Sequence, residues 1–81
     1  MGELVMLDKV VKCVEKTVGL EIKGVNADTK IKDSGIDSLY LFKFVGVIES
    51  EFEIEIEDID LTPKNFETFG TVTELILKYK K

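Results

Sequence analysis

The sequence predicts an all-α fold: a small four-helix bundle with three main helices, a short third helix, and a long loop between helices 1 and 2. Apolar residues recur at spacings of three and four in three separate segments. Residues 52–56 alternate apolar and acidic side chains, but no second run of that kind exists to pair with them as a strand. The 81 residues suffice for one hydrophobic core, so residues 1–81 are expected to form a single domain.

The first predicted helix ends near Gly19 and has one apolar stripe with the helical period: Leu4, Leu7, Val11, Val14 and Val18. Cys13 lies away from the centre of that stripe, so we expect a peripheral thiol without a chemical role. A single cysteine excludes an internal disulfide and a CxxC metal site, and it is compatible with a reducing cytoplasm.

Residues 19–37 are predicted to form the long loop, because they contain the turn-forming residues Gly19, Gly24, Asn26, Asp28, Ser34 and Gly35. Loops of this length are uncommon in small domains and are more often functional or held by their own side chains. The end of this loop leads directly into the second helix.

The second helix is predicted to run from Ser38 to Phe52. Its expected buried face consists of residues at spacings of three and four: Leu39, Phe42, Val45, Ile48 and Phe52. Phe44 is expected to widen this face.

The last third of the chain is expected to contain an extended connector and two helices. The connector inserts Ile54 and Ile56 into the core. Thr62 before Pro63 is typical of a helix start and predicts the short helix through Glu67, anchored by Phe66. Thr71 and Glu74 fit a capping box for the last helix, whose expected buried side is Val72, Leu75, Ile76 and Tyr79, with Lys78, Lys80 and Lys81 at its C-terminal end.

The composition excludes several classes of function. The chain has no His, which removes the usual general base and the commonest metal ligand, so we expect no catalytic residue, no metal site and no enzyme activity of its own. It has no Arg, and its pI near 4.7 argues against nucleic acid as a partner. We expect neither a signal peptide nor a membrane span, and a cytoplasmic protein.

The net charge of −5 is concentrated in the middle of the chain. Residues 33–67 hold two Lys and ten acidic residues, whereas residues 1–32 and 68–81 are both slightly basic. Such a segment is either a solvated acidic face or a docking surface for basic partners, and charge alone leaves both possibilities open.

Ser38, at the head of the second helix, is the residue that could carry chemistry. Asp37 or Ser38 could simply cap the helix. A serine nucleophile with an internal base is excluded, since no His exists to activate it. A helix N-terminus is, however, a favourable place for a phosphate group, and a serine hydroxyl there could carry a phosphodiester.

The segment Gly35-Ile36-Asp37-Ser38-Leu39 resembles the G-x-D-S-L phosphopantetheine attachment motif of acyl and peptidyl carrier proteins. The resemblance covers nearly the whole chain, including the first amphipathic helix, residues 28–31 of the loop, and residues 51–56 and 61–66. The sequence therefore resembles the acyl carrier protein family, and the resemblance is to a specialised, discrete member of it.

The resemblance implies that a phosphopantetheinyl transferase, using Mg²⁺, moves 4'-phosphopantetheine from coenzyme A onto the Ser38 hydroxyl. The thiol of the arm then holds an acyl or aminoacyl group as a thioester. The protein, expected to be a monomer, carries this group between loading enzymes and acyl-processing or transfer enzymes of fatty-acid, polyketide or related biosynthesis. Asp37 would adjoin the phosphate and Leu39 the emerging arm, while long acyl chains would enter the bundle between Phe42, Val45, Ile56 and Leu75.

The chain differs from fatty-acid carriers two and five residues after the serine. Those carriers have acids there, whereas this sequence has Tyr40 and Lys43, and a reversed charge can exclude a partner. The residues expected to recognise partners are Tyr40, Lys43, Glu49, Glu51, Ile56 and Glu57. This difference favours a specialised carrier, for polyketide, nonribosomal peptide, modified-lipid or polysaccharide acylation, although both positions could also be neutral surface changes.

Other functions remain as alternatives. Within the same family, the chain could be an aminoacyl, D-alanyl or peptidyl carrier. From a different class, it could be a helical interaction module without a prosthetic group, in which the motif only caps a helix. Calcium binding is disfavoured, because residues 49–60 lack the ligand pattern and central glycine of an EF-hand loop.

Overall fold

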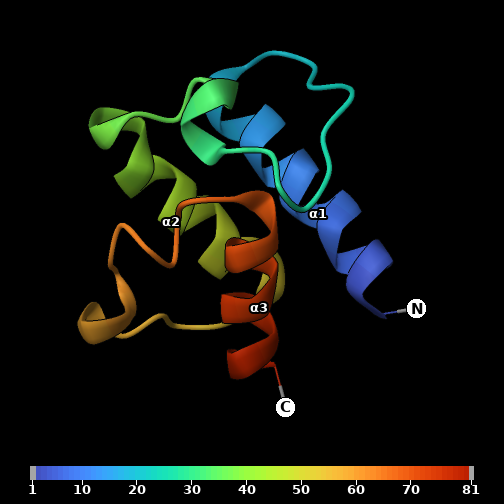
Figure 1. Cartoon of the computed structure of the whole chain (residues 1–81). Coiled ribbons are helices and arrows are strands. Elements are labelled where there is room, and N and C mark those ends of the chain that lie inside the picture. The colour runs from blue at the N-terminus through green and yellow to red at the C-terminus, as the bar shows by residue number, and fades with distance from the viewer. Residues whose placement is uncertain (1, 81) are drawn as a thin grey trace.

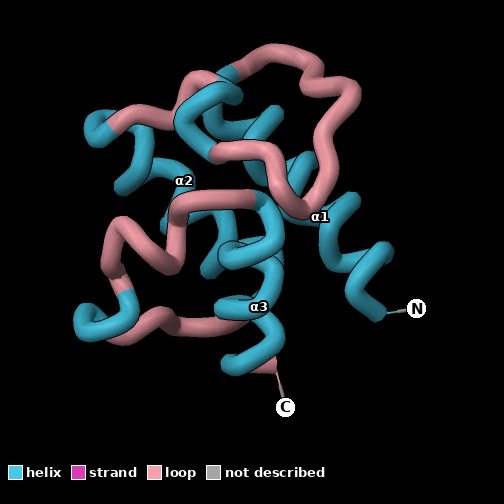
Figure 2. The backbone as a smooth tube through the Cα atoms, in the orientation of Figure 1, coloured by secondary structure: helices cyan, strands magenta, loops and turns pink. Residues whose placement is uncertain are grey.

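The computed structural model describes the backbone of residues 2–80 and the side chains of residues 5–80. The element order is α1 (Gly2–Val18), a 3₁₀ helix η1 (Ile31–Ser34), α2 (Ser38–Phe52), a 3₁₀ helix η2 (Asp58–Asp60) and α3 (Phe69–Tyr79). The three α-helices enclose one core, and loops make up most of the remaining chain (Figures 1 and 2). Within the described residues there is no strand, so the predicted all-α class is confirmed.

The buried face of α1 is rotated from the predicted stripe. The side chains that face α2 and α3 recur at i, i+3, i+4 and i+7, as an α-helix requires, and all are nearly inaccessible: Val10, Cys13, Val14 and Thr17. The predicted residues Leu7, Val11 and Val18 are half-buried at the border of this face, and the side chain of Leu4 lies outside the described residues.

The expectation that Cys13 is peripheral is therefore wrong, because Cys13 is fully buried in the core. Burial, and secondarily the charge of Glu51, raises the pKa of this thiol to about 11. A thiol with this pKa is protonated near neutral pH, which lowers its reactivity as a nucleophile.

The bounds of α2 match the prediction, but only the second half of its predicted buried face does. Phe44, Ile48 and Phe52 are buried, whereas Leu39 and Phe42 are 85% and 83% exposed. Steps of three fall short of a full helical turn by about 60°, so a 39–42–45–48 series drifts about 180° around the helix. The true face follows steps of four and consists of Phe44, Ile48 and Phe52.

The predicted short helix at residues 62–67 is instead a series of tight turns. The amides of Asn65, Phe66 and Glu67 each donate to the carbonyl three residues earlier. The Thr62 hydroxyl accepts the Asn65 amide at 3.3 Å, and Phe66 is buried, as predicted. The short 3₁₀ helix η2 lies earlier in the chain, at Asp58–Asp60.

The last helix begins three residues earlier than predicted. Its N-cap is Thr68, whose hydroxyl accepts the Thr71 amide at 3.0 Å while the Thr71 hydroxyl accepts the Thr68 amide. Thr71 therefore closes the capping box instead of opening it. The predicted buried side is confirmed, since Val72, Leu75 and Ile76 are buried and Tyr79 is half-buried; Lys78 lies in the last turn, Lys80 is the C-cap, and Lys81 lies outside the described residues.

The long loop is held against the start of α3 by backbone hydrogen bonds. The amides of Phe69 and Gly70 donate to the carbonyls of Thr29 and Ala27, at 3.0 and 2.8 Å. A Cβ atom on Gly70 would stand 2.9 Å from the Ala27 oxygen, so only glycine permits this approach. The Ile31 amide donates to the Glu67 carbonyl at 2.9 Å, which joins the end of the loop to the 61–67 segment.

Candidate functional site

Ser38 is the first residue of α2, and its side chain is exposed. The Asp37 carboxylate caps the helix by accepting the amides of Leu39 and Tyr40 at 3.0 and 3.1 Å. Gly35 ends η1 with φ at +95°, a left-handed conformation that favours glycine, and so turns the chain into α2. The three motif positions thus have distinct local functions: Gly35 makes the turn, Asp37 starts the helix, and Ser38 presents its hydroxyl to solvent.

The electrostatic potential at the start of α2 favours an anion, but two of the backbone amides there already donate hydrogen bonds to Asp37. The helix dipole places partial positive charge near Ser38. The Leu39 and Tyr40 amides are bound by Asp37, so they are not free to bind a phosphate as the sequence argument assumed.

Ser38 borders a groove of about 600 Å³. One wall consists of residues between Lys30 and Leu41, and the facing wall consists of residues 61–67. The apolar residues Ile31, Ile36 and Phe66, which line the groove, are 2%, 4% and 6% exposed, so their side chains are held firmly by the core. The groove therefore combines an exposed hydroxyl with a rigid apolar lining.

Two predicted recognition residues, Tyr40 and Lys43, lie on the exposed part of α2. Leu39, predicted beside the arm, is exposed next to them, and so is Phe42, which was predicted to be in the core. We refer to Leu39, Tyr40, Phe42 and Lys43 as the α2 surface. Two large apolar side chains with a single charge make this surface unusual for an acidic protein.

The other predicted recognition residues are engaged within the fold. Glu49 accepts the Ile56 amide at 2.9 Å, and Glu51 pairs with Lys16 of α1 at 2.9 Å. The side chain of Ile56 is buried. Glu57 has an exposed side chain, and its amide donates to the Tyr79 hydroxyl at 3.0 Å.

The acyl pocket inferred from the resemblance is not assembled as expected. Ile56 and Leu75 are buried and Val45 is half-buried, but Phe42 projects into solvent and cannot line a cavity with them. The space next to Ser38 lies instead in the groove between residues 30–41 and 61–67.

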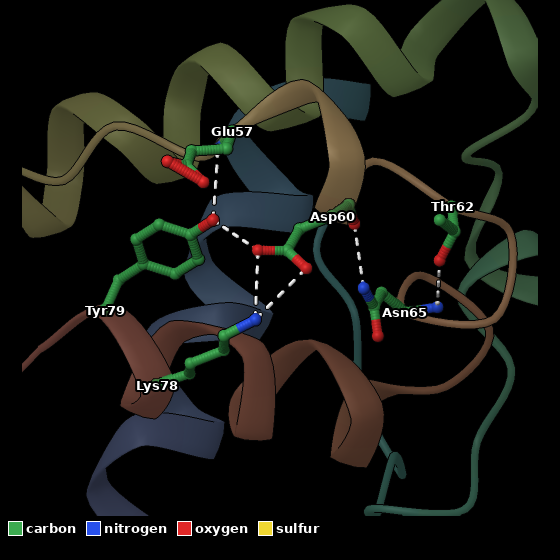
Figure 3. A network of polar contacts seen from close by, with 6 residues as sticks. All are labelled: Glu57, Asp60, Thr62, Asn65, Lys78 and Tyr79. Carbon is green, nitrogen blue, oxygen red and sulfur yellow. Dashed lines mark hydrogen bonds and ion pairs between the residues drawn. The ribbon is translucent and has the colours of Figure 1, made fainter.

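A polar network at the end of α3 holds the segment that leads to the groove (Figure 3). The Tyr79 hydroxyl accepts the Glu57 amide and donates to the Asp60 carboxylate, which Lys78 also contacts at 3.1 Å. The Asn65 side chain donates to the Asp60 carbonyl at 2.8 Å. These contacts fix η2 against α3 and thereby position Leu61 and Thr62 in the groove wall.

This network predicts a pH-dependent contribution to stability. The hydrogen bond from Tyr79, followed by that from Lys78, lowers the pKa of Asp60, and the bond to Asp60 raises the pKa of Tyr79. A lowered acid pKa means stability that is present above the ordinary Asp pKa of about 3.9 and lost as pH falls through the folded value. The pKa of Tyr79 is shifted in the opposite direction. Its contribution to the free energy of unfolding is therefore lost as pH rises beyond about 10.

We therefore expect Tyr79→Phe to lower Tm by a few degrees near neutral pH, because the phenol hydroxyl bridges two elements. The difference from the wild type should shrink as the solution is acidified below pH of about 4. Thermal melts of both proteins between acidic and neutral pH measure this, with Tyr40→Phe on the exposed α2 surface as the matched control. A difference in Tm that stays constant down to the lowest pH measured would contradict the stabilising role of the Tyr79–Asp60 hydrogen bond.

Among the described residues, no three His, Cys, Asp or Glu side chains come together in a way that could hold a metal ion. In the same part of the chain, none of the helices has the length and apolarity needed to cross a membrane.

Sequence reasoning missed three lysines of the groove. Lys30 and Lys32 belong to one wall and Lys64 to the other. Lys64 lies more than thirty positions after Lys30 and Lys32, and no local pattern indicated that these segments meet. The Lys30–Thr68 bridge and the Ile31–Glu67 hydrogen bond bring the two walls together.

Comparison with known proteins agrees with this geometry. Residues 8–76 match a family model described as the phosphopantetheine attachment site. A chain in the crystal structure of the Bradyrhizobium japonicum glycine:[carrier protein] ligase complexed with glycylated carrier protein is 23% identical, with a TM-score of 0.73 over 88% of this chain and 97% of that chain. A chain in the structure of the same ligase with its cognate carrier protein and an analogue of glycyl adenylate is 21% identical, with a TM-score of 0.71 over 95% and 96% of the two chains.

The match over most of the sequence shows that this chain belongs to the phosphopantetheine attachment-site family. It is a carrier protein, and its prosthetic group is 4'-phosphopantetheine, as the resemblance in sequence implied. The structure fits that group, since an exposed hydroxyl at a helix N-terminus opens onto an apolar groove with cationic side chains.

Proposed function

We propose that Ser38 carries the phosphopantetheine arm and that the protein delivers acyl or aminoacyl groups between enzymes of fatty-acid, polyketide or related biosynthesis. The observation that carries this proposal is the exposed Ser38 hydroxyl at the first position of α2, inside the Gly35–Leu39 motif and beside the groove. When bound, the arm supplies a thiol that holds its cargo as a thioester.

The protein's own residues position the arm and perform no catalytic step in this proposal. Asp37 fixes the first turn of α2, so that Ser38 is presented in one place. The sequence contains no His that could activate the hydroxyl, so a phosphopantetheinyl transferase must supply the base and Mg²⁺. In this proposal the protein is a monomer and works in the cytoplasm. A free cysteine such as Cys13 remains reduced in that compartment.

The experiment is a two-step loading assay. The protein is first incubated with coenzyme A, Mg²⁺ and a broad-specificity phosphopantetheinyl transferase, and its intact mass is expected to rise by one phosphopantetheine. The product is then offered amino acids with adenylating ligases, or malonyl groups with a fatty-acid malonyl transferase. Absence of any mass gain with several transferases would refute the proposal and favour the helical interaction module.

Aminoacyl delivery is the second candidate function. Two of the structurally similar proteins come from complexes with a glycine:[carrier protein] ligase, and one of these holds a glycylated carrier protein. Aminoacylation of the holo form by such a ligase, in preference to malonyl loading, would select this candidate.

We further propose that the α2 surface selects the partner enzymes. Leu39 and Phe42 offer apolar contacts, and Lys43 offers a positive charge beside them. A partner with an apolar pocket and a nearby carboxylate fits this surface, whereas a basic docking site is repelled by Lys43. In this proposal Tyr40 and Glu57 also contact partners, while Glu49, Glu51 and Ile56 act through the fold that they stabilise.

A charge reversal tests this selection. Lys43→Glu should increase malonyl loading by a fatty-acid malonyl transferase about tenfold in kcat/KM, because one close charge pair changes from repulsive to attractive. The control is Lys12→Glu, which makes the same change in net charge on the exposed side of α1. Efficient malonyl loading of the wild-type protein, or an equal effect of both variants, would contradict the proposal.

A further inference from the structure

A hollow of about 340 Å³ lies on the surface between α1 and α2, away from the groove beside Ser38. Both helices contribute to its lining, which consists of Lys16, Lys43, Gly46, Val47, Ser50 and Glu51. We refer to these residues as the α1–α2 hollow. It shares Lys43 with the α2 surface and no residue with the groove.

A row of positive charge borders this hollow on the α1 side. Lys9 and Lys16 are both exposed, and residues seven positions apart on an α-helix are rotated by only about 20° from each other. The hydrogen bond and charge of Lys16 lower the pKa of Glu51 in α2, and Lys9 contributes more weakly. The row formed by Lys9 and Lys16 therefore lies beside α2.

The carboxylate of the hollow does not balance its lysines. Glu51 is the one acidic residue of the lining, and it is already paired with Lys16 at 2.9 Å. Lys9 and Lys43 form no ion pair with any residue whose side chain the structure describes. A chain with a net charge of −5 thus has a local excess of positive charge here, which favours an acidic partner.

Gly46 is a residue that the fold itself does not require. It lies inside α2, is exposed, and is not among the glycines with a positive φ, so the backbone does not demand glycine. A Cβ atom at this position would meet no packing neighbour within 4 Å. Glycine in a helix interior is destabilising relative to alanine. The missing side chain instead leaves space in the hollow for the close approach of another molecule.

A helix of another protein fits this hollow better than a membrane does. Gly46 and Ser50 lie one turn apart, and their short side chains allow a second helix to approach the backbone of α2. A flat anionic membrane would also meet the exposed Glu53 and Glu55, which follow α2 directly and would be repelled. A single helix can lie in the hollow without reaching them.

We propose that the α1–α2 hollow is a docking site for an acidic helix of a partner protein. Carboxylates on successive turns of that helix pair with Lys9, Lys16 and Lys43, and its backbone approaches α2 at Gly46. Gly46 lies about 12 Å along α2 from Ser38, so a partner docked here leaves the Ser38 hydroxyl accessible. The inference does not depend on attachment of the arm.

The test uses two stapled helical peptides as probes. One has glutamates on successive turns of one face and alanines elsewhere, and the other has glutamines in place of the glutamates. Each is titrated into the protein without a prosthetic group, and amide chemical shifts are followed by NMR. We expect saturable shifts in residues 9–17 and 43–51, and about tenfold weaker binding of the glutamine peptide, as expected for three exposed ion pairs. Added salt should weaken binding of the glutamate peptide.

Gly46→Ala separates docking from stability. The substitution should raise Tm by a few degrees, because alanine favours the helix and the fold leaves room for its methyl group. It should nevertheless weaken binding of the glutamate peptide by about fivefold or more, as overpacking of a close contact does. A merely structural role of Gly46 cannot give both results together.

Lysine variants test the charges. Replacing Lys16 and Lys43 together by Gln should reduce binding of the glutamate peptide to the level of the glutamine peptide. The matched control replaces Lys12 and Lys23 by Gln, at exposed positions outside the lining, and should preserve binding. Lys12 is rotated by about 40–60° from the row, and of the three α1 lysines that lower the pKa of Glu51 it contributes least.

Several results would overturn the inference. These are equal binding of the two peptides, shifts confined to other parts of the surface, a lower Tm or unchanged binding for Gly46→Ala, and an equal loss in the control lysine variant. Tighter binding of phosphatidylglycerol vesicles than of the glutamate peptide would also overturn it and assign the surface to a membrane. Failure of phosphopantetheine attachment would refute the proposed function and leave this inference standing.

Discussion

Ser38→Ala is expected to abolish phosphopantetheine attachment completely while leaving the fold intact. The hydroxyl oxygen is the atom that forms the phosphodiester, and alanine has no group that can replace it. The side chain of Ser38 is exposed, and the helix is capped by Asp37, so the substitution removes no buried contact. Intact mass after incubation with coenzyme A and a transferase measures the loss, and circular dichroism verifies the fold.

The two other serines of the chain provide matched controls for this variant. Ser34 lies in η1, four residues before the attachment position, and Ser50 is exposed on α2. Ser34→Ala and Ser50→Ala should both gain one phosphopantetheine, as the wild type does. A mass gain in Ser38→Ala, or its loss in Ser50→Ala, would contradict the assignment.

Phe44→Ala is expected to cause the largest loss of stability among the substitutions considered. The Phe44 side chain is fully buried and packs edge-to-face on Phe66, with ring centroids 6.4 Å apart. Truncation of a buried phenylalanine costs about 3–5 kcal/mol. A domain of this size has a free energy of unfolding of only about 4–12 kcal/mol, so the variant should lose a large fraction of its stability.

Phe42→Ala is the matched control for this prediction, because the same residue type stands two positions earlier on the same helix. Phe42 is 83% exposed, so its truncation should change the free energy of unfolding by less than about 0.5 kcal/mol. It should instead reduce loading by partner enzymes, since Phe42 belongs to the proposed docking surface. Urea unfolding of both variants makes the comparison, and equal losses of stability would show that α2 is rotated from the orientation described.

The pair Phe42 and Phe44 also shows how far the sequence determines the fold. The bounds of α2 were predictable, because Asp37 and the apolar run mark its start and extent locally. The buried face was not, since apolar residues occur all around this helix and spacings of three and of four both describe a stripe. Which stripe is buried depends on contacts with α1 and Phe66, which lie far away in the sequence.

The same distinction applies to the site. The motif around Ser38 is five consecutive residues, so the hydroxyl and its helix cap could be identified directly from the sequence. The groove could not, because it forms only when the Ile31 amide binds the Glu67 carbonyl and the Asp60–Tyr79 contact fixes η2 against α3. Lys30 and Lys64 come to line one groove only through these long-range contacts.

The most direct measurement of the central claim is the position of the prosthetic group. After incubation with coenzyme A and a transferase, the protein is digested and the modified peptide is sequenced by mass spectrometry. We expect a single phosphopantetheine, on Ser38. Modification at Ser34, Ser50 or any other residue, or an unmodified chain under conditions that convert a known carrier protein, would contradict this account.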